Sequence, residues 1–160
     1  MLFARLMGLS LCCLPLTALA TCIGVNCTCS IAANPFSFGN YSPFNATATT
    51  ATGTVSVTCS ALLVGLNVSY VISLNMGSSG TFANRTMKLS STNLNYNIYT
   101  TAADTTVWGD GTSGTGTISD AYILNVLSMT RNYTLFGAIP ALQNVGPGTY
   151  TDTLTATVTY

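Results

Sequence analysis

The feature that most limits how this chain can fold is the alternation of apolar and polar residues in short runs. The clearest case is the final segment, TDTLTATVTY, where Leu154, Ala156, Val158 and Tyr160 alternate with threonines. A period of two places these four side chains on one face of a β-strand. A strand of this kind at an exposed sheet edge favours aggregation, so the pattern raises the question of what covers it.

Similar runs occur along most of the chain, separated by clusters of Gly, Pro, Asn and Ser, and helical periodicity is nearly absent. This organisation is typical of an all-β sandwich or barrel. We predict strands at Ser30–Phe38, Thr52–Cys59, Leu66–Leu74, Thr86–Ser90, Leu94–Thr100, Ala121–Ser128, Tyr133–Ile139 and Thr149–Tyr160. No linker divides them, so we expect a single domain.

The first residues of the chain have the features of a secretory signal peptide. Arg5 precedes an apolar stretch that ends in the small residues Ala18 and Ala20. We therefore predict a signal peptide over residues 1–20 and one exported domain over residues 21–160. A lipoprotein with a lipidated cysteine just after this segment is a less favoured alternative.

Four cysteines follow the predicted signal peptide: Cys22, Cys27, Cys29 and Cys59. An even number of cysteines in an exported chain predicts disulfides. A bridge between Cys27 and Cys29 would strain a very short loop, which leaves two of the possible pairings. Of these we prefer Cys29–Cys59 with Cys22–Cys27. A zinc site of four thiolates is the rival interpretation, and the oxidising compartment makes it less favourable.

The composition argues against several classes of function. The chain has no His, and its four basic and four acidic residues give a formal net charge of zero. It also lacks Glu, so no general acid–base pair is evident, and we expect no enzyme and no cofactor. Without a basic patch, nucleic acid is not an expected partner. Asp110 lies in a Gly-rich run without the repeated acidic residues of a calcium loop, so we interpret it as a turn residue and expect no metal.

One apolar segment joins two predicted strands. Connections normally run along the surface, so an exposed ALLVGL segment could be an adhesive or partner-binding tip formed by Leu62, Leu63, Val64 and Leu66. The alternative, which we favour from the sequence, is that the segment folds into the core. Trp108 is likewise interpreted as a buried anchor rather than a sugar-stacking platform.

Several motifs occur in an order that resembles a known family. They are Phe36–Pro43 (FSFGNYSP), Ala51–Cys59 (ATGTVSVTC), Arg85–Met87 (RTM), Leu94–Tyr99 (LNYNIY), Val107–Thr112 (VWGDGT), Tyr133–Pro140 (YTLFGAIP), Gly148–Tyr150 (GTY) and Asp152–Tyr160 (DTLTATVTY). From about Cys29 to the C-terminus, this ordered set resembles the spore coat protein U (SCPU) domain, the subunit family of archaic chaperone–usher pili of the Csu type.

The resemblance implies an incomplete immunoglobulin-like β-sandwich that lacks its final strand. In that family a periplasmic chaperone lends a strand to the open groove, and the N-terminal extension of another subunit replaces it at an outer-membrane usher. Leu154, Ala156, Val158 and Tyr160 would then form one wall of the acceptor groove. The family's disulfide would map to Cys29–Cys59, in agreement with the preferred pairing.

Such a subunit would pass through the periplasm to a pilus on the cell surface, where it would serve adhesion and biofilm formation. Its partners would be the chaperone, the usher and other pilus subunits. A self-assembling spore-coat or surface protein is one alternative, and a small carbohydrate-binding β-sandwich is another.

The N-terminus departs from the family pattern. Only TCIGVNCT, residues 21–28, separates the predicted signal peptide from Cys29, and a fibre subunit needs a longer alternating segment to donate a strand. A bridge between Cys22 and Cys27 would also prevent this segment from extending. We therefore expect the chain to accept a strand without donating one, as suits a tip or terminal subunit.

Overall fold

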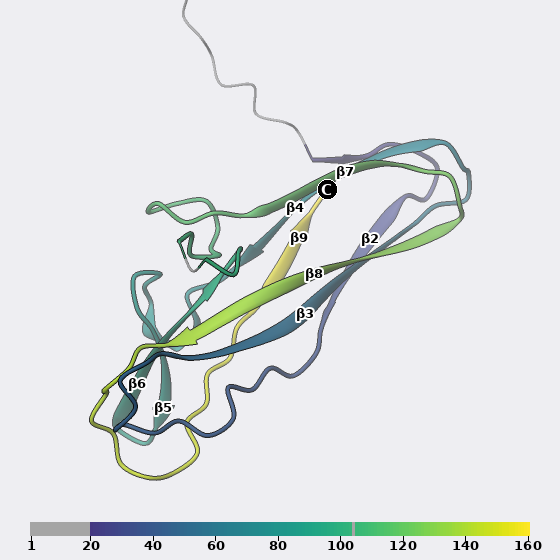
Figure 1. The fold of residues 1–160 in the computed structure, drawn as a ribbon. Coiled ribbons are helices and arrows are strands. Elements are labelled where there is room, and N and C mark those ends of the chain that lie inside the picture. The colour runs from purple at the N-terminus through teal and green to yellow at the C-terminus, as the bar shows by residue number, and fades with distance from the viewer. Residues whose placement is uncertain (1–19, 104) are drawn as a thin grey trace, which may run out of the picture.

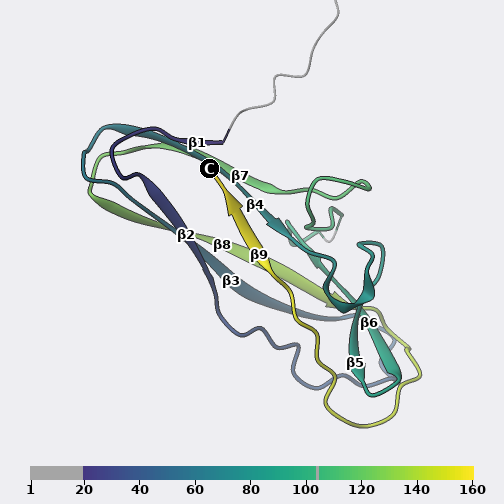
Figure 2. The same ribbon diagram turned by 180° about the vertical axis from the view of Figure 1, so that it is seen from behind.

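The computed structural model describes residues 20–103 and 105–160, so the predicted signal peptide lies almost wholly outside the described part. The chain folds into two antiparallel β-sheets that pack as a sandwich (Figures 1 and 2). The strands are β1 (Thr21–Cys22), β2 (Thr28–Ala33), β3 (Thr49–Ser60), β4 (Leu66–Leu74), β5 (Arg85–Leu89), β6 (Thr92–Tyr99), β7 (Ile118–Leu124), β8 (Ser128–Ile139) and β9 (Ala156–Thr159).

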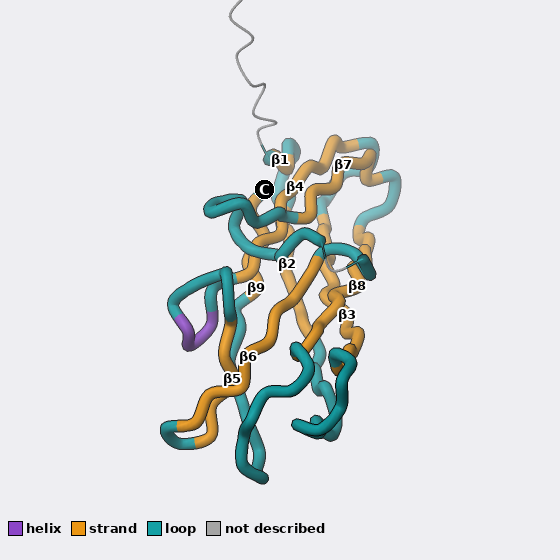
Figure 3. The backbone as a smooth tube through the Cα atoms, turned by 60° about the vertical axis from the view of Figure 1, so that its left-hand side comes forward, coloured by secondary structure: helices purple, strands orange, loops and turns teal. Residues whose placement is uncertain are grey.

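One sheet has the strand order β2-β3-β8-β6-β5. In the other, β7 lies on one side of β4, and β1 and β9 share the opposite side. The described helical structure is a single turn, η1 (Gly77–Ser79), seen in Figure 3. Nowhere in residues 20–103 and 105–160 does a helix have the length and hydropathy that a membrane span requires.

The sandwich core is built by alternation along the strands. In β4, Val68, Tyr70, Ile72 and Leu74 are buried, and the residues between them are only half-buried. The bounds predicted for this strand are confirmed. Trp108 is fully buried in the same core, and its Nε1 donates a hydrogen bond of 3.1 Å to the carbonyl oxygen of Ile72.

A buried arginine links the core to the loops beside it. Arg85 is fully buried, and its guanidinium donates to the carbonyl oxygens of Asn75 (2.7 Å) and Trp108 (2.7 Å). It also donates to Oδ1 of Asn97 over 2.8 Å. A buried charge is tolerated only when its donors are satisfied, and here three acceptors surround it.

Two disulfides join cysteines within the described part of the chain. Cys29 and Cys59 are directly opposite on β2 and β3, and their sulfur atoms are 2.04 Å apart. Cys22 and Cys27 are also bonded and close the loop between β1 and β2. The structure therefore brings together the two pairs that we preferred from the sequence.

The final segment differs from the predicted continuous strand Thr149–Tyr160. Only Ala156–Thr159 forms a strand, and it pairs with β4. Thr151 instead pairs with Lys88 of β5, in the other sheet, through hydrogen bonds of 2.8 and 3.1 Å. The strand is therefore interrupted at residues 152–155, because the chain crosses there from one sheet to the other.

The predicted strand Ser30–Phe38 is also too long. β2 ends at Ala33, two residues before Pro35. Proline has no backbone N–H to give to a sheet and restricts the residue before it, so pairing stops here. The segment that follows leaves β3 and becomes part of the site described next.

Candidate functional site

A cavity of about 1150 Å³ opens between the two sheets. Within the described residues, β2 pairs only with β3 and β9 pairs only with β4. Each of these two strands therefore has one edge without a hydrogen-bonded partner strand. The cavity walls come from the residues that follow β2 and those that precede β9. Figure 2 shows these two segments running along the same side of the sandwich.

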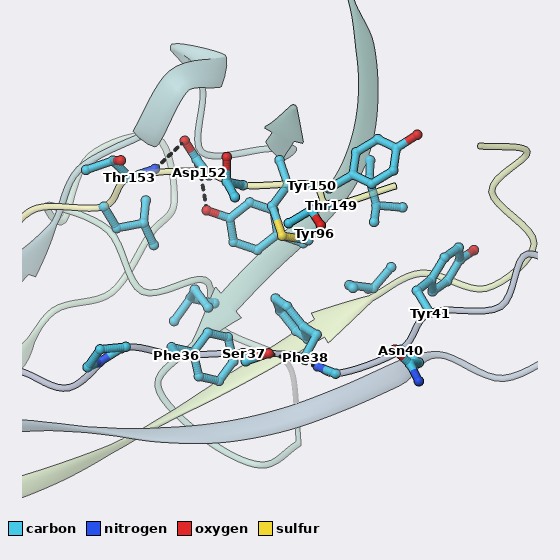
Figure 4. A pocket seen from close by; sticks show the side chains of 18 of the residues that line it. Phe36, Ser37, Phe38, Asn40, Tyr41, Tyr96, Thr149, Tyr150, Asp152 and Thr153 are labelled. Carbon is cyan, nitrogen blue, oxygen red and sulfur yellow. Dashed lines mark hydrogen bonds between the residues drawn. The ribbon is translucent and has the colours of Figure 1, made fainter. Parts of the chain in front are cut away.

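Aromatic rings form much of one wall of this groove (Figure 4). Phe36 and Phe38 meet edge to face with their centroids 4.8 Å apart. Phe38 meets Tyr96 of β6 in the same way at 5.8 Å. The aromatic wall is therefore apolar and broad, which suits large apolar side chains from a ligand.

Two strand glycines allow these rings to lie against the sheet. A Cβ atom on Gly137 of β8 would lie 2.6 Å from Phe36 Cζ and 2.8 Å from the ring of Phe38. A Cβ atom on Gly53 of β3 would lie 2.9 Å from Phe36 Cδ2. A glycine inside a strand often marks such a close approach. The sheet surface at Gly53 and Gly137, beneath the two rings, is the floor of the groove. A glycine inside a predicted strand is the sequence signal that could have located it.

A carboxylate organises the opposite wall. Tyr96 OH donates to Asp152 Oδ2 over 2.6 Å, while the backbone amides of Ser78 and Thr153 donate to Oδ1 over 2.9 and 2.8 Å. Burial and the neighbouring Asp152 carboxylate raise the pKa of Tyr96, so its hydroxyl stays neutral and remains a donor. These bonds fix the chain where it crosses between the sheets, as the dashed lines in Figure 4 indicate.

The structure separates the four residues predicted to form the acceptor wall. Leu154 and Ala156 line the cavity and are half-buried. Val158 does not line it and packs against the core instead. Tyr160 is also absent from the cavity wall and is 41% exposed. The groove thus lies beside the interrupted part of the segment and does not follow all of it.

A second feature lies at the end of the sandwich where β3 and β7 end. Leu62, Leu63 and Val64 are 63%, 55% and 57% exposed, so our favoured interpretation that this segment folds into the core is wrong. Leu66 does not belong to the exposed loop, because it lies half-buried in β4.

Two other connections bring exposed apolar residues to the same end. The amide of Ala61 donates to the carbonyl oxygen of Leu127 (3.0 Å), and that of Gly65 to the carbonyl oxygen of Leu124 (2.7 Å). We call the whole surface the apolar tip; its exposed residues are Ile23, Val25, Leu62, Leu63, Val64, Val126 and Leu127. The sequence segments 21–28, 61–66 and 125–128 that form it contain no charged residue.

A polar network closes the edge opposite the groove. Arg131 of β8 donates to Asp120 of β7 over 2.9 Å, and Tyr133 OH also donates to this carboxylate. Tyr70 OH hydrogen-bonds to Tyr133 OH and extends the network to β4. The Arg131 guanidinium and the other bonds hold the pKa of Asp120 below its usual range. This edge is held by side chains, whereas the groove edge is open.

The structure gives no sign of a metal centre among the residues it describes. No group of three or more His, Cys, Asp or Glu side chains there is placed to bind a metal ion. Asp110 Oδ1 accepts from the amide and hydroxyl of Thr112 over 2.9 and 2.6 Å, as a turn residue does.

The fold and groove define an all-β sandwich of the pilin type. The model of the Spore Coat Protein U domain matches residues 16–157, and the chain belongs to that family. No curated protein sequence matches this chain.

A solved structure is also similar: the CsuC–CsuE chaperone–tip adhesion subunit pre-assembly complex from the archaic chaperone–usher Csu pili of Acinetobacter baumannii. The TM-score is 0.55 at 25% sequence identity, over 84% of this chain. This chain spans only 40% of the length of the chain it matches there.

Proposed function

We propose that this protein is a structural subunit of a chaperone–usher pilus and that a strand from another protein completes its fold. The observation that carries the proposal is the cavity between the two sheets, which is walled by the segment that follows β2 and the segment that precedes β9. An added strand gains backbone hydrogen bonds from unpaired segments of this kind, and its alternate side chains fill pockets between the sheets. Phe36 and Phe38 on one side, with Leu154 and Ala156 on the other, supply those pockets.

Its partners are then a periplasmic chaperone, an outer-membrane usher and other pilus subunits. The family match and the likeness to a chaperone-bound Csu tip subunit support this assignment. Export directed by residues 1–20 would bring the domain, residues 21–160, to the periplasm and then to the cell surface. The family points to a structural role and not to an enzyme.

We place the subunit at the tip or end of the fibre. Thr21 and Cys22 pair with Ser69 and Val68 of β4, and the Cys22–Cys27 disulfide closes the loop that follows. Residues 21–28 are therefore engaged within their own domain and are not free to serve as a donor strand. The apolar tip gives such a subunit an adhesive surface of uncharged, exposed side chains, larger than scattered single residues would provide.

The fully buried Trp108 offers no stacking platform, so the carbohydrate-binding alternative is not supported by that residue. The spore-coat alternative differs in needing no chaperone. Periplasmic expression with and without the chaperone of its own pilus system tests the choice. We expect soluble protein only with the chaperone, as a one-to-one complex. A stable, soluble monomer made without any partner would contradict the proposal.

A further inference from the structure

We propose that a clamp of four side chains closes a second open edge of the sandwich, so that strand addition is confined to the groove. The cross-sheet clamp consists of Asp120, Arg131, Tyr133 and Tyr70, from β7, β8 and β4. This inference rests on the strand acceptance proposed above and names the feature that determines where a strand can add.

The sandwich has unpaired strand edges on the side away from the groove. Among the strands that the structure describes, β7 pairs with β4 alone. β6 pairs with β8 only at Phe136–Ala138, so residues 128–135 of β8 have β3 as their one described partner. In an antiparallel strand, alternate residues point their N–H and C=O groups away from a given neighbour. These two edges therefore present backbone groups that another strand can bind.

The cross-sheet clamp spans the gap between these two edges. Arg131 of β8 donates from Nε to Asp120 Oδ2 over 2.9 Å and from Nη2 to Oδ1 over 3.3 Å. Tyr133 OH, also from β8, donates to the same carboxylate and hydrogen-bonds to Tyr70 OH of β4. The Arg131 guanidinium lies 5.0 Å from the ring centre of Tyr122, in cation–π geometry. Side chains thus tie β8 to both strands of the facing sheet.

The two charged residues of the clamp occupy strand positions that face the inside of the sandwich. Arg131 is directly opposite the fully buried Val57 on β3, and opposite residues share a face. Asp120 alternates with the exposed Ser119 and Ala121. Inward-pointing charges are one means by which natural sheets prevent a strand from adding at an edge. An added strand here would remove the Asp120–Arg131 pair from water and disturb its geometry, which is unfavourable.

The groove side differs in its chemistry. Phe36 and Phe38 on one wall face Leu154 and Ala156 on the other, across a cavity of about 1150 Å³. Apolar side chains of an added strand gain free energy there in proportion to the area they remove from water. At the clamped edge the same side chains would meet a carboxylate and a guanidinium. The difference between the two sides therefore favours addition at the groove.

Without the clamp, the edge best placed to bind β7 is the β7 of a second copy of this chain. Two identical edges can pair antiparallel about a twofold axis, and each then presents the same groups to the other. Asp120 is the only charged residue in Ile118–Leu124, so its removal leaves an uncharged strand with no like-charge repulsion. We therefore expect variants that lack the clamp to dimerise edge to edge.

The test is the sedimenting mass of the purified one-to-one chaperone complex, in which the groove is already occupied. Asp120→Ala and Arg131→Ala are each expected to raise this mass about twofold as the protein concentration increases. Amide hydrogen exchange in residues 118–124 should become slower as the dimer forms, whereas a merely structural loss would make it faster. The wild-type complex should keep its one-to-one mass.

Asp110→Ala is the matched control. It removes one carboxylate, with the same change of net charge, but Asp110 is exposed and bonds to Thr112 within its own turn. Its complex should sediment like the wild type. The charge-swapped variant, Asp120→Arg with Arg131→Asp, restores an opposite-charge pair and should dimerise less than either single change. Tyr133→Phe removes a single hydroxyl and should give a smaller dimer fraction than Asp120→Ala, which provides a milder variant if the alanine changes prevent folding.

The outcomes separate this inference from the proposed function. It is wrong if the clamp variants keep the one-to-one mass, if the wild type dimerises equally, or if Asp110→Ala dimerises as much, since the cause would then be net charge. Release of the chaperone from the variant complexes would show association through an emptied groove, which overturns the clamp and leaves the proposed function standing. If the wild-type complex does not form at all, the proposed function fails and the inference fails with it.

Discussion

The groove floor provides a sensitive test of strand acceptance, through the single change Gly137→Ala. Without a bound strand, the added methyl group would displace the rings of Phe36 and Phe38 toward the adjoining cavity. In the proposed strand-bound state, the donor strand would occupy that space. The substitution should therefore weaken strand binding much more than it affects folding of the rest of the domain.

The magnitude follows from the distances. Carbon atoms in contact are normally about 3.5–4.0 Å apart, whereas the new Cβ would lie 2.6 Å from Phe36 Cζ and 2.8 Å from Phe38. The rings must move by about 1 Å, and overpacking of this kind costs about 1–3 kcal/mol. This corresponds to a loss of affinity for the strand of about 5- to 150-fold.

The assay is the release of labelled chaperone from the purified complex after addition of excess unlabelled chaperone. Most differences in affinity between closely related complexes are differences in dissociation rate, so release should be faster by the same factor. Gly146→Ala is the control. Gly146 lines the same cavity, but a Cβ atom there would meet nothing within 4 Å, and release should be unchanged.

Equal release rates for Gly137→Ala and the wild type would refute the reasoning, because the groove would then not hold the strand against these rings. Faster release for Gly146→Ala would show that the effect comes from general destabilisation of the cavity walls.

Other changes test the fold and the site. Leu154→Asp places a charge on the apolar groove wall and should abolish chaperone capture in a pull-down; normal capture would remove Leu154 from the strand-binding surface. Arg85→Met leaves buried carbonyl oxygens without a donor and should lower the unfolding free energy of the complex in urea by about 3–5 kcal/mol; a loss below about 1 kcal/mol would show that water replaces the guanidinium. Cys59→Ser removes the bridge to β2 and should reduce the periplasmic yield of folded protein, since a disulfide is worth about 2–4 kcal/mol; an unchanged yield would show that the bridge is dispensable. The pKa of Asp120 is lowered in the folded state, so its contribution to stability is present above about pH 4 and is lost as the pH falls through the folded value. Thermal unfolding scans should show this acid loss in the wild type and a smaller one in Asp120→Asn, and identical pH profiles would contradict the role of the Arg131 contact.

Much of the fold can be predicted from the sequence because the residue pattern that specifies each strand lies within that strand. The period of two along Leu66–Leu74 specifies a strand and its buried face without reference to any partner, and the bounds are confirmed. The all-β fold class is confirmed for the same reason, since short alternating runs between turn residues leave few other architectures.

The interruption of the C-terminal strand at residues 152–155 could not be predicted from the sequence. The inward face is the same on both sides of the interruption, so Asp152, Leu154, Ala156 and Val158 are all half-buried, although the charged Asp152 breaks the apolar series. What changes is the neighbouring strand, which is β5 for Thr151 and β4 for Ala156–Thr159. Sequence periodicity reports which face is buried and carries no information on which sheet supplies the partner.

The exposure of the apolar tip and the packing at the groove floor could not be predicted from the sequence, for two different reasons. An apolar run such as Leu62–Val64 has the same sequence pattern in a core as on an exposed surface. Burial is the more common environment for such a run, but here the three side chains are exposed. The contact of Phe36 with Gly137 joins residues a hundred positions apart in sequence. Its only local sign was a glycine within a strand.

The crossing of the C-terminal segment also determines how the domain would carry tension. If the proposed donor strand binds in the cavity, a pulled fibre would transmit force to the domain through the segment after β2 and the segment before β9. On one side the Cys29–Cys59 bridge carries that force covalently from β2 to β3. On the other, the same segment is attached to β4 through β9 and to β5 through Thr151, so both sheets share the load. The domain would then yield by shearing many hydrogen bonds at once and not by peeling away its last strand.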